Sequence, residues 1–168
     1  SFSGYSFCKA HSASFAVESF QSLYLKAYYP LEFIVAVINN FGGFYTTEQY
    51  FHEARMLGAQ IHPPCINHSR TLTHVQDKDI YMGLSHIHQL EHKTIRKILY
   101  QRSIAGPFQN LQDFVNRVSI SSEQLDLLIR IGAFRFCGLS KCELLWEKNA
   151  VFNPNPKRNI GQVLFPTS

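Results

Sequence analysis

Residues 83–99 read GLSHIHQLEHKTIRKIL, and this stretch decides the fold that the sequence predicts. Its apolar positions indicate a short turn containing Leu84 and Ile87, followed by a break at residues 89–91. A helix comes next, with an apolar inner face that continues to residue 99. The pattern therefore predicts a helix, a tight hairpin and a second helix.

The outer face of that second helix is basic, because it carries Lys93, Arg96 and Lys97. Hairpin amides and a helix N-terminus can face a phosphate, while Lys and Arg side chains neutralise the neighbouring phosphates. This arrangement is typical of a segment that grips nucleic-acid backbone. The alternative, which this stretch alone leaves open, is a surface helix with ordinary solvated charges.

The composition favours one or two small folded domains. With 168 residues, 45% of them hydrophobic, the chain can build a core, and its mild net charge of +4 requires any basic patch to come from local clustering. No run reaches the roughly 18 apolar residues of a membrane span, so no membrane partner is expected. The four cysteines follow no disulfide pattern, which favours a reduced cytoplasm. Because the chain starts with Ser rather than Met, we expect an internal fragment of a longer protein.

The remaining sequence predicts a mainly α fold with a small β connector. Helices are expected at residues 9–28, 31–39, 46–58, 111–118, 121–132 and 141–149, and strands at residues 59–62, 71–75 and 79–82. Thr46, Ser121 and Ser140 are each followed three residues later by Gln or Glu, the pattern of a capping box. The helix expected at residues 31–39 is apolar nearly all round and should be buried. Residues 81–139 are expected to contain two helix–turn–helix units in tandem, the second spanning residues 111–138.

Metal binding and catalysis find little support in the residue pattern. Two histidine groups have suggestive spacings, but solvated or hydrogen-bonded histidines explain both, so no metal site is expected. These groups are His62, Cys65, His68 and His74, and His86, His88 and His92. The acidic residues do not cluster as two-metal chemistry requires, and no nucleophile motif is present. No catalytic residue is expected in this chain.

The first predicted helix opens with Lys9 and His11. A Lys and a His at a helix N-terminus can hold a phosphate or triphosphate, although capping and solvent contact explain them equally well.

Several segments together resemble one family. Residues 4–16, GYSFCKAHSASFA, are similar to the "GYGFNKSHSAAYA" segment of the DNA polymerase III alpha subunit family, the C-family replicative polymerases of bacteria. Residues 25–33 resemble its "LKAHYPAEF", residues 53–58 its "EARRLG", and residues 63–67 its "PPDVN". Gly83 opens its first helix–hairpin–helix unit, and residues 132–134 close the second.

The resemblance implies a division of the chain into the end of the fingers (1–58), a connector (59–82), a tandem helix–hairpin–helix domain (83–152) and a linker (153–168). It implies nucleotide contacts for Lys9 and His11, and a catalytic Mg site in a palm domain that lies outside this chain. It also implies contacts with primer-template duplex and with other polymerase III subunits. The duplex contacts are expected at Gly83, His86, His88, Lys93, Arg96 and Lys97.

Two departures from the family pattern qualify these expectations. The family hairpin reads "GVG", but here residues 89–91 are Gln, Leu and Glu. At roughly 5 Å and an effective dielectric near 20, Glu91 would repel a phosphate by about 3 kcal/mol before salt screening. We therefore expect weak duplex binding through the helix charges.

The second departure lies in the tail. Gln162, Leu164 and Phe165 stand where the family has a sliding-clamp-binding peptide, but the spacing is one residue short. Two function classes stay open from the sequence: a part of a polymerase that positions duplex DNA, and a protein-interaction module of the replisome whose hairpin has lost DNA binding.

Overall fold

The structure is a computed structural model that describes residues 9–43 and 45–152. Within these residues the chain forms seven α-helices, two short 3-10 helices and one three-stranded sheet. It divides into two compact units: the first holds residues up to 64 together with 68–88, and the second holds 65–67 together with the residues from 89 on. The predicted mainly α fold with a small β connector is confirmed.

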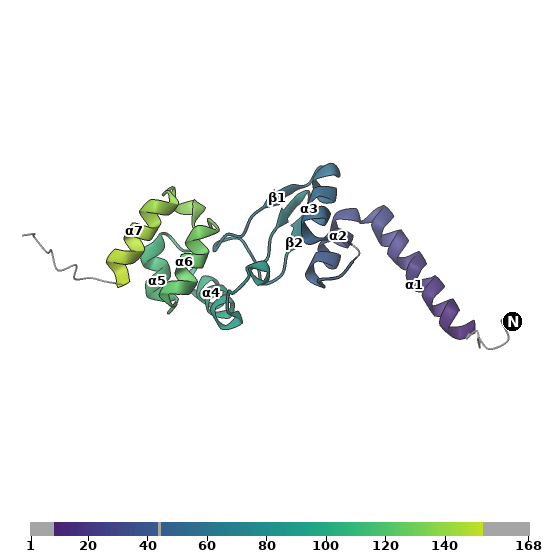
Figure 1. Ribbon diagram of the computed structural model, residues 1–168, viewed down its shortest axis with the longest axis horizontal. Coiled ribbons are helices and arrows are strands. Elements are labelled where there is room, and N and C mark those ends of the chain that lie inside the picture. The colour runs from purple at the N-terminus through teal and green to yellow at the C-terminus, as the bar shows by residue number, and fades with distance from the viewer. Residues whose placement is uncertain (1–8, 44, 153–168) are drawn as a thin grey trace, which may run out of the picture. The chain divides into compact units, whose positions relative to one another are not determined.

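The first unit begins with three helices. They are α1 (Lys9–Tyr28), α2 (Pro30–Asn39) and α3 (Thr47–Met56) (Figure 1). The bounds of α1 agree with the prediction, and α2 begins one residue earlier than predicted because proline is well suited to the first turn of a helix. Thr46 forms the predicted capping box with Gln49 in both directions.

The core of the first unit joins α2 and α3 to the sheet. Its buried side chains are Leu31, Ile34, Val35, Ile38, Tyr50, Phe51, Ala54, Ala59 and Ile80. The expected burial of α2 holds for one side only, since Glu32 and Ala36 are exposed on the other. On α1 the apolar side chains are largely exposed, with Phe20 at 71%.

The sheet has the order β1-β3-β2. Its strands are β1 (Gln60–His62), β2 (His74–Gln76) and β3 (Asp79–Tyr81). β2 and β3 form the predicted hairpin, whereas β1 pairs with β3 in parallel. β2 starts three residues later than predicted because Thr71 and Thr73 bond elsewhere: the Thr71 carbonyl accepts from the Ser85 amide at 3.0 Å, and the Thr73 hydroxyl accepts from the Gly83 amide at 3.0 Å.

Four helices build the second unit. They are α4 (His92–Ala105), α5 (Leu111–Arg117), α6 (Ser122–Arg130) and α7 (Lys141–Phe152) (Figure 1). Phe114 lies at the centre of an edge-to-face aromatic cluster, with ring centroids 5.0 Å from both Phe108 and Phe134. α7 runs three residues beyond its predicted end at 149, because the next residue that breaks a helix in the sequence is Pro154.

The first unit also contains the 3-10 helix η1 (Leu84–His86), and the second contains η2 (Arg135–Cys137). The helix expected before the first hairpin is therefore a single turn. None of the described helices is long and apolar enough to cross a membrane.

Candidate nucleic-acid interface

The first hairpin, residues 89–91, leads into α4. Gln89 has a φ of +68°, a left-handed conformation that glycine adopts readily and other residues rarely do. Leu90 anchors the hairpin because its side chain is buried. Glu91 is the N-cap residue of α4 but makes no side-chain cap. The hairpin thus has a glycine-like backbone at Gln89.

The second hairpin, residues 118–121, joins α5 to α6. Val118 is fully buried at the end of α5. Ser121 caps α6, its hydroxyl accepting the Gln124 amide proton at 3.3 Å.

Both hairpins line one polar hollow of about 270 Å³. Its walls are Glu91, Lys93, Thr94, Lys97, Ser119, Ile120, Ser121 and Gln124. α4 and α6 both begin here, and the N-terminus of a helix attracts negative charge. Two hairpins, two helix N-termini and two lysines therefore converge on a hollow that can accept an anion.

A side chain of each following helix, Gln124 on α6 and Lys97 on α4, bonds to the other hairpin. The Gln124 carboxamide accepts the Glu91 amide proton at 2.9 Å and donates to the Gln89 carbonyl at 2.8 Å. Lys97 Nζ donates to the Ser119 carbonyl at 3.1 Å. The two hairpins are thereby held as one element.

Glu91 forms an ion pair with Lys93, whose Nζ lies 2.8 Å from the carboxylate. Both side chains are well exposed, so the pair contributes at most about 1 kcal/mol to stability. The Glu91 carboxylate nevertheless neutralises the Lys93 ammonium group, which would otherwise be available to an incoming phosphate.

The predicted DNA-binding residues fall into two groups. Lys93 and Lys97 line the hollow, and Arg96 is exposed on α4 between them in sequence. Gly83, His86 and His88 belong to the first unit. Contact of any of these residues with DNA stays a prediction.

Gly83 and His86 have structural roles within the first unit. A side chain at Gly83 would come within 2.4 Å of the Leu72 backbone, so the close backbone approach there is to the protein itself. The His86 ring lies 3.4 Å from the Asn39 Oδ1 and packs on Phe41, and burial lowers the pKa of His86. His88 is exposed.

The remaining predicted contacts stay predictions. Lys9 is the first residue of α1, and the exposed His11 packs edge-on against Phe15, with ring centroids 4.4 Å apart. Gln162, Leu164 and Phe165 lie outside the described residues.

The histidines of the sheet surround a tyrosine. His62 and His74 pair with Tyr81 from the two neighbouring strands and stack on its ring at 4.6 and 5.1 Å, and His62 Nε2 lies 2.6 Å from Asp79 Oδ1. Because the tyrosine ring lies between them, these two imidazoles do not converge on one point. The described residues contain no group of three or more His, Cys, Asp or Glu that could hold a metal ion.

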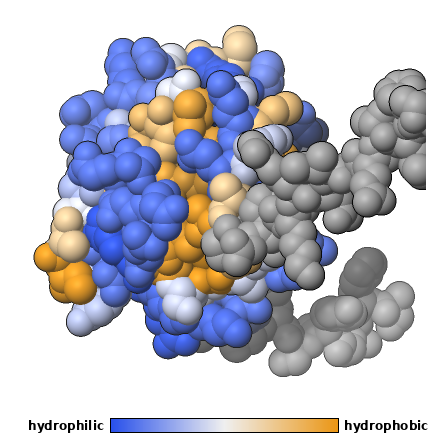
Figure 2. Space-filling view, turned by 90° about the vertical axis from the view of Figure 1, so that its left-hand side faces the viewer, coloured by the Kyte–Doolittle hydropathy of each residue, from blue (hydrophilic) through white to orange (hydrophobic). Residues whose placement is uncertain are grey.

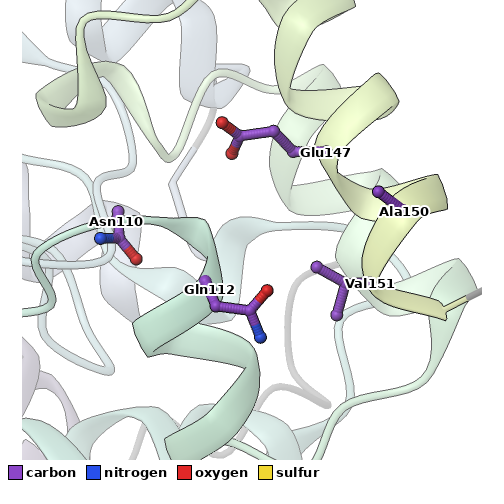
Figure 3. Close-up of a pocket in the computed structure, with 5 residues that line it drawn as sticks. All are labelled: Asn110, Gln112, Glu147, Ala150 and Val151. Atoms are coloured by element: carbon purple, nitrogen blue, oxygen red, sulfur yellow. The ribbon is translucent and has the colours of Figure 1, made fainter. Parts of the chain in front are cut away.

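Two other hollows of the second unit are unsuited to phosphate. One, of about 340 Å³, is lined by Asn110, Gln112, Glu147, Ala150 and Val151, and Figure 3 shows Glu147 and Gln112 coming to it from α7 and α5. It carries an acidic group and none of its five lining residues is basic. The other, of about 440 Å³, is lined by Leu139, Cys142, Glu143, Trp146 and Glu147. On the face seen in Figure 2, apolar residues form a band between hydrophilic ones.

Sequence reasoning missed the contribution of Gln124 and of the second hairpin to the hollow. Ser121 and Gln124 were recognised by their spacing, but only as a capping box. The available signal was the polar pair Ser121 and Gln124 at the start of the helix after the second hairpin, which corresponds to the basic start of the helix after the first hairpin.

Comparisons with known proteins agree with this geometry. A family model described as "Helix-hairpin-helix motif" matches residues 58–144, just over half of the chain. The "Error-prone DNA polymerase" of Mycobacterium tuberculosis H37Rv is 30% identical over 163 residues, which cover 95% of this chain and 15% of that protein. The "DNA polymerase III subunit alpha" of Thermus aquaticus is 33% identical over 136 residues, covering 79% of this chain and 11% of that protein. The "DNA polymerase III subunit alpha" of Helicobacter pylori 26695 is 31% identical over 157 residues, which cover 86% of this chain and 13% of that protein.

The chain thus spans between 11% and 15% of the length of these relatives. The resemblance drawn from its sequence segments is confirmed by relatives that match most of the chain and by the motif that matches its two hairpins. The chain belongs to the helix-hairpin-helix family and is homologous to a segment of the C-family DNA polymerases, the DNA polymerase III alpha subunits and error-prone DNA polymerases.

Proposed function

We propose that the second unit binds the backbone of duplex DNA and so helps to position primer-template in a C-family polymerase. The observation that carries this proposal is the convergence of both hairpins, the N-termini of α4 and α6, Lys93 and Lys97 on one polar hollow. Backbone amides and cations around a polar hollow are the chemistry of phosphate contact. Such contacts position a duplex without reading its sequence.

The contacts should be few and sensitive to salt. Lys93, Arg96 and Lys97, with the helix N-termini, supply three or four phosphate contacts, for which the log–log slope of affinity against salt is about −3. Because the Glu91 carboxylate already engages Lys93 and the Gln124 side chain engages the Glu91 amide, we expect weak binding that depends mainly on the helix charges.

Fluorescence anisotropy with a labelled primer-template duplex at several salt concentrations tests the proposal. Replacing Lys93 and Arg96 together by Glu should weaken binding at least tenfold and reduce the salt slope by about 2. Arg55→Glu together with Lys78→Glu, at two exposed positions of the first unit, is the control, since it changes the net charge by the same amount. The proposal fails if the Lys93 and Arg96 double variant binds no more weakly than this control.

The wider role follows from the relatives and is part of the same proposal. In a full-length DNA-directed DNA polymerase active in replication, this segment would be non-catalytic, and α1 would bring Lys9 and His11 to the incoming nucleotide. The catalytic Mg would be held elsewhere, and the setting would be the cytoplasm. Loss of nucleotide affinity on changing His11 to Ala in the full-length enzyme, with His52→Ala as a surface control, would support the fingers contact.

A protein-interaction role is the second candidate, and the apolar hollow on α7 favours it. Trp146 lines that hollow and is 80% exposed, and exposed aromatic residues are enriched at protein interfaces. A protein-only module would show almost no salt slope with DNA. Trp146→Ala should then abolish retention of purified polymerase III subunits, while Trp146→Phe should preserve it.

Sliding-clamp binding by the tail is tested separately. Changing Leu164 and Phe165 together to Ala should abolish a clamp pull-down if the tail binds the clamp. Unchanged retention of the clamp would exclude the tail as its binding segment.

A further inference from the structure

Gln124 differs from the other residues at its position in a capping box. In the two complete boxes, each cap hydroxyl accepts the amide proton of the residue three positions later, and that residue's side chain accepts the cap amide proton in return. Thr46 and Gln49 exchange these bonds at 3.3 and 2.9 Å. Ser140 and Glu143 exchange them at 3.3 and 2.7 Å.

At α6 only the first of these bonds is local. The Ser121 hydroxyl accepts the Gln124 amide proton at 3.3 Å, but the Gln124 side chain reaches 33 residues back to the Glu91 amide at 2.9 Å. It also donates to the Gln89 carbonyl at 2.8 Å. The side chain thus serves the first hairpin instead of its own helix.

The Gln124 Oε1 makes the contact that a phosphate oxygen would make at a hairpin. It is a polar oxygen in line with the Glu91 N–H, in a hollow that Lys93 and Lys97 also line. The cations are engaged in a similar way, Lys93 by the Glu91 carboxylate and Lys97 by the Ser119 carbonyl. Three hydrogen-bond donors around the hollow, the Glu91 amide, Lys93 and Lys97, are therefore already bonded to acceptors of the protein itself.

We propose that Gln124 is an internal substitute for a backbone phosphate, which closes the first hairpin until duplex DNA displaces it. This inference rests on the proposed duplex binding. A hydrogen bond between two neutral groups contributes little net free energy, whereas a hydrogen bond from a backbone amide to an anionic phosphate is roughly twice as strong, so exchange is feasible. The affinity for duplex is reduced by the cost of displacing the carboxamide.

Two substitutions at this position should act in opposite directions. Gln124→Ala removes the substitute and should tighten duplex binding about fivefold, the effect of one ordinary hydrogen bond. Gln124→Glu keeps an acceptor, makes it anionic, and should weaken binding by at least the same factor. Both keep the Ser121 cap, which uses the backbone amide of residue 124. Gln112→Ala is the control, since it removes the same side chain from α5, where it donates to Asn116.

A second measurement is independent of duplex binding. In ¹⁵N-labelled protein, titration with inorganic phosphate should shift the Glu91 amide resonance at lower phosphate concentration in Gln124→Ala than in the wild type. Gln112→Ala should behave as the wild type does. The inference is overturned if Gln124→Ala needs as much phosphate as the wild type, or if it binds duplex more weakly, which would make Gln124 a residue that holds the hairpin ready for DNA.

The two proposals fail in different ways. If neither wild type nor Gln124→Ala binds duplex, the proposed function fails, and the phosphate titration alone decides whether Gln124 occupies an anion position. If wild type binds duplex with the expected salt slope and Gln124→Ala binds no more tightly, the substitute role fails and the proposed function stands.

Discussion

Gly83 and Gln89, six residues apart in the same motif, separate two reasons for which a chain uses glycine. Gly83 has an ordinary φ of −72°, but its Cα faces the backbone of residues 71–73 so closely that a side chain would overlap it. Gln89 has a side chain and room for it, yet its φ is +68°. Position 83 requires glycine because no side chain fits there, whereas position 89 adopts a glycine-like conformation although its residue is Gln.

The difference shows where each region is constrained. At Gly83 the constraint is packing inside the first unit, where the Gly83 amide also donates to the Thr73 hydroxyl. At Gln89 the constraint is the turn itself, whose left-handed conformation costs about 1–2 kcal/mol for a residue with a Cβ. Packing is intolerant of one added carbon, whereas a strained turn can be formed by a residue other than glycine.

The largest expected effect is at Gly83. Gly83→Ala should lower the free energy of unfolding of the first unit by about 3 kcal/mol, because the new Cβ meets rigid backbone. Urea unfolding followed by circular dichroism measures this. Gly42→Ala is the matched control: the nearest atom to its Cβ would be 3.8 Å away, so a change of less than about 0.5 kcal/mol is expected. Equal effects at the two glycines would refute the packing role.

Glu91 provides the next effect. Glu91→Gln removes the negative charge beside Lys93 and should tighten duplex binding about threefold to tenfold at low salt, with the gain shrinking as salt rises. Anisotropy against salt concentration measures it. Glu147→Gln, on α7, changes the net charge equally, and a gain of the same size there would mean that bulk charge, not the hairpin, limits binding.

A smaller effect is expected at Gln89. Gln89→Gly relieves the left-handed strain but increases the freedom of the unfolded chain, so the free energy of unfolding should rise by no more than about 1 kcal/mol. Asp77→Gly, at a φ of 54°, is the comparison, and its gain should be smaller because Asp tolerates this conformation better. A clear loss of stability in Gln89→Gly would show that the Gln89 side chain itself supports the hairpin.

The smallest effect concerns His86. Burial lowers its pKa in the folded state, so the unfolded chain binds more protons near and below the ordinary histidine pKa of about 6.5. Stability contributed by neutral His86 is therefore present above that pH and is lost as the pH falls through it. Between about pH 7.5 and pH 5, His86→Gln should lose less stability than the wild type. A pH dependence of unfolding in His86→Gln equal to that of the wild type would show that His86 does not carry the effect.

Much of the local structure could be predicted from the sequence. The caps at Thr46, Ser121 and Ser140 involve partners three residues away, so the information lies in four consecutive residues. The β2–β3 hairpin is local in the same sense. The basic character of α4 was evident as well, because Lys93, Arg96 and Lys97 recur at helical spacing.

Other features arise from contacts between segments far apart in the chain. The parallel pairing of β1 with β3 joins segments 19 residues apart, as in the Gln60 and Asp79 pair, and short strands carry no signal for such a partner. The helix expected before the first hairpin is one 3-10 turn, since the Leu84 and Ser85 amides bond to the Arg70 and Thr71 carbonyls.

The sequence by itself determined the family, the helices and their caps, because these depend on residue types within a few positions of one another. Only the tertiary structure decided that the Gln124 side chain would leave its own cap and serve a hairpin 33 residues earlier. It also decided that Gly83 would be needed for packing and that both hairpins would line one hollow. A side chain with two possible hydrogen-bond partners takes the one that the packed core brings within reach, and that distance is not written in any local pattern.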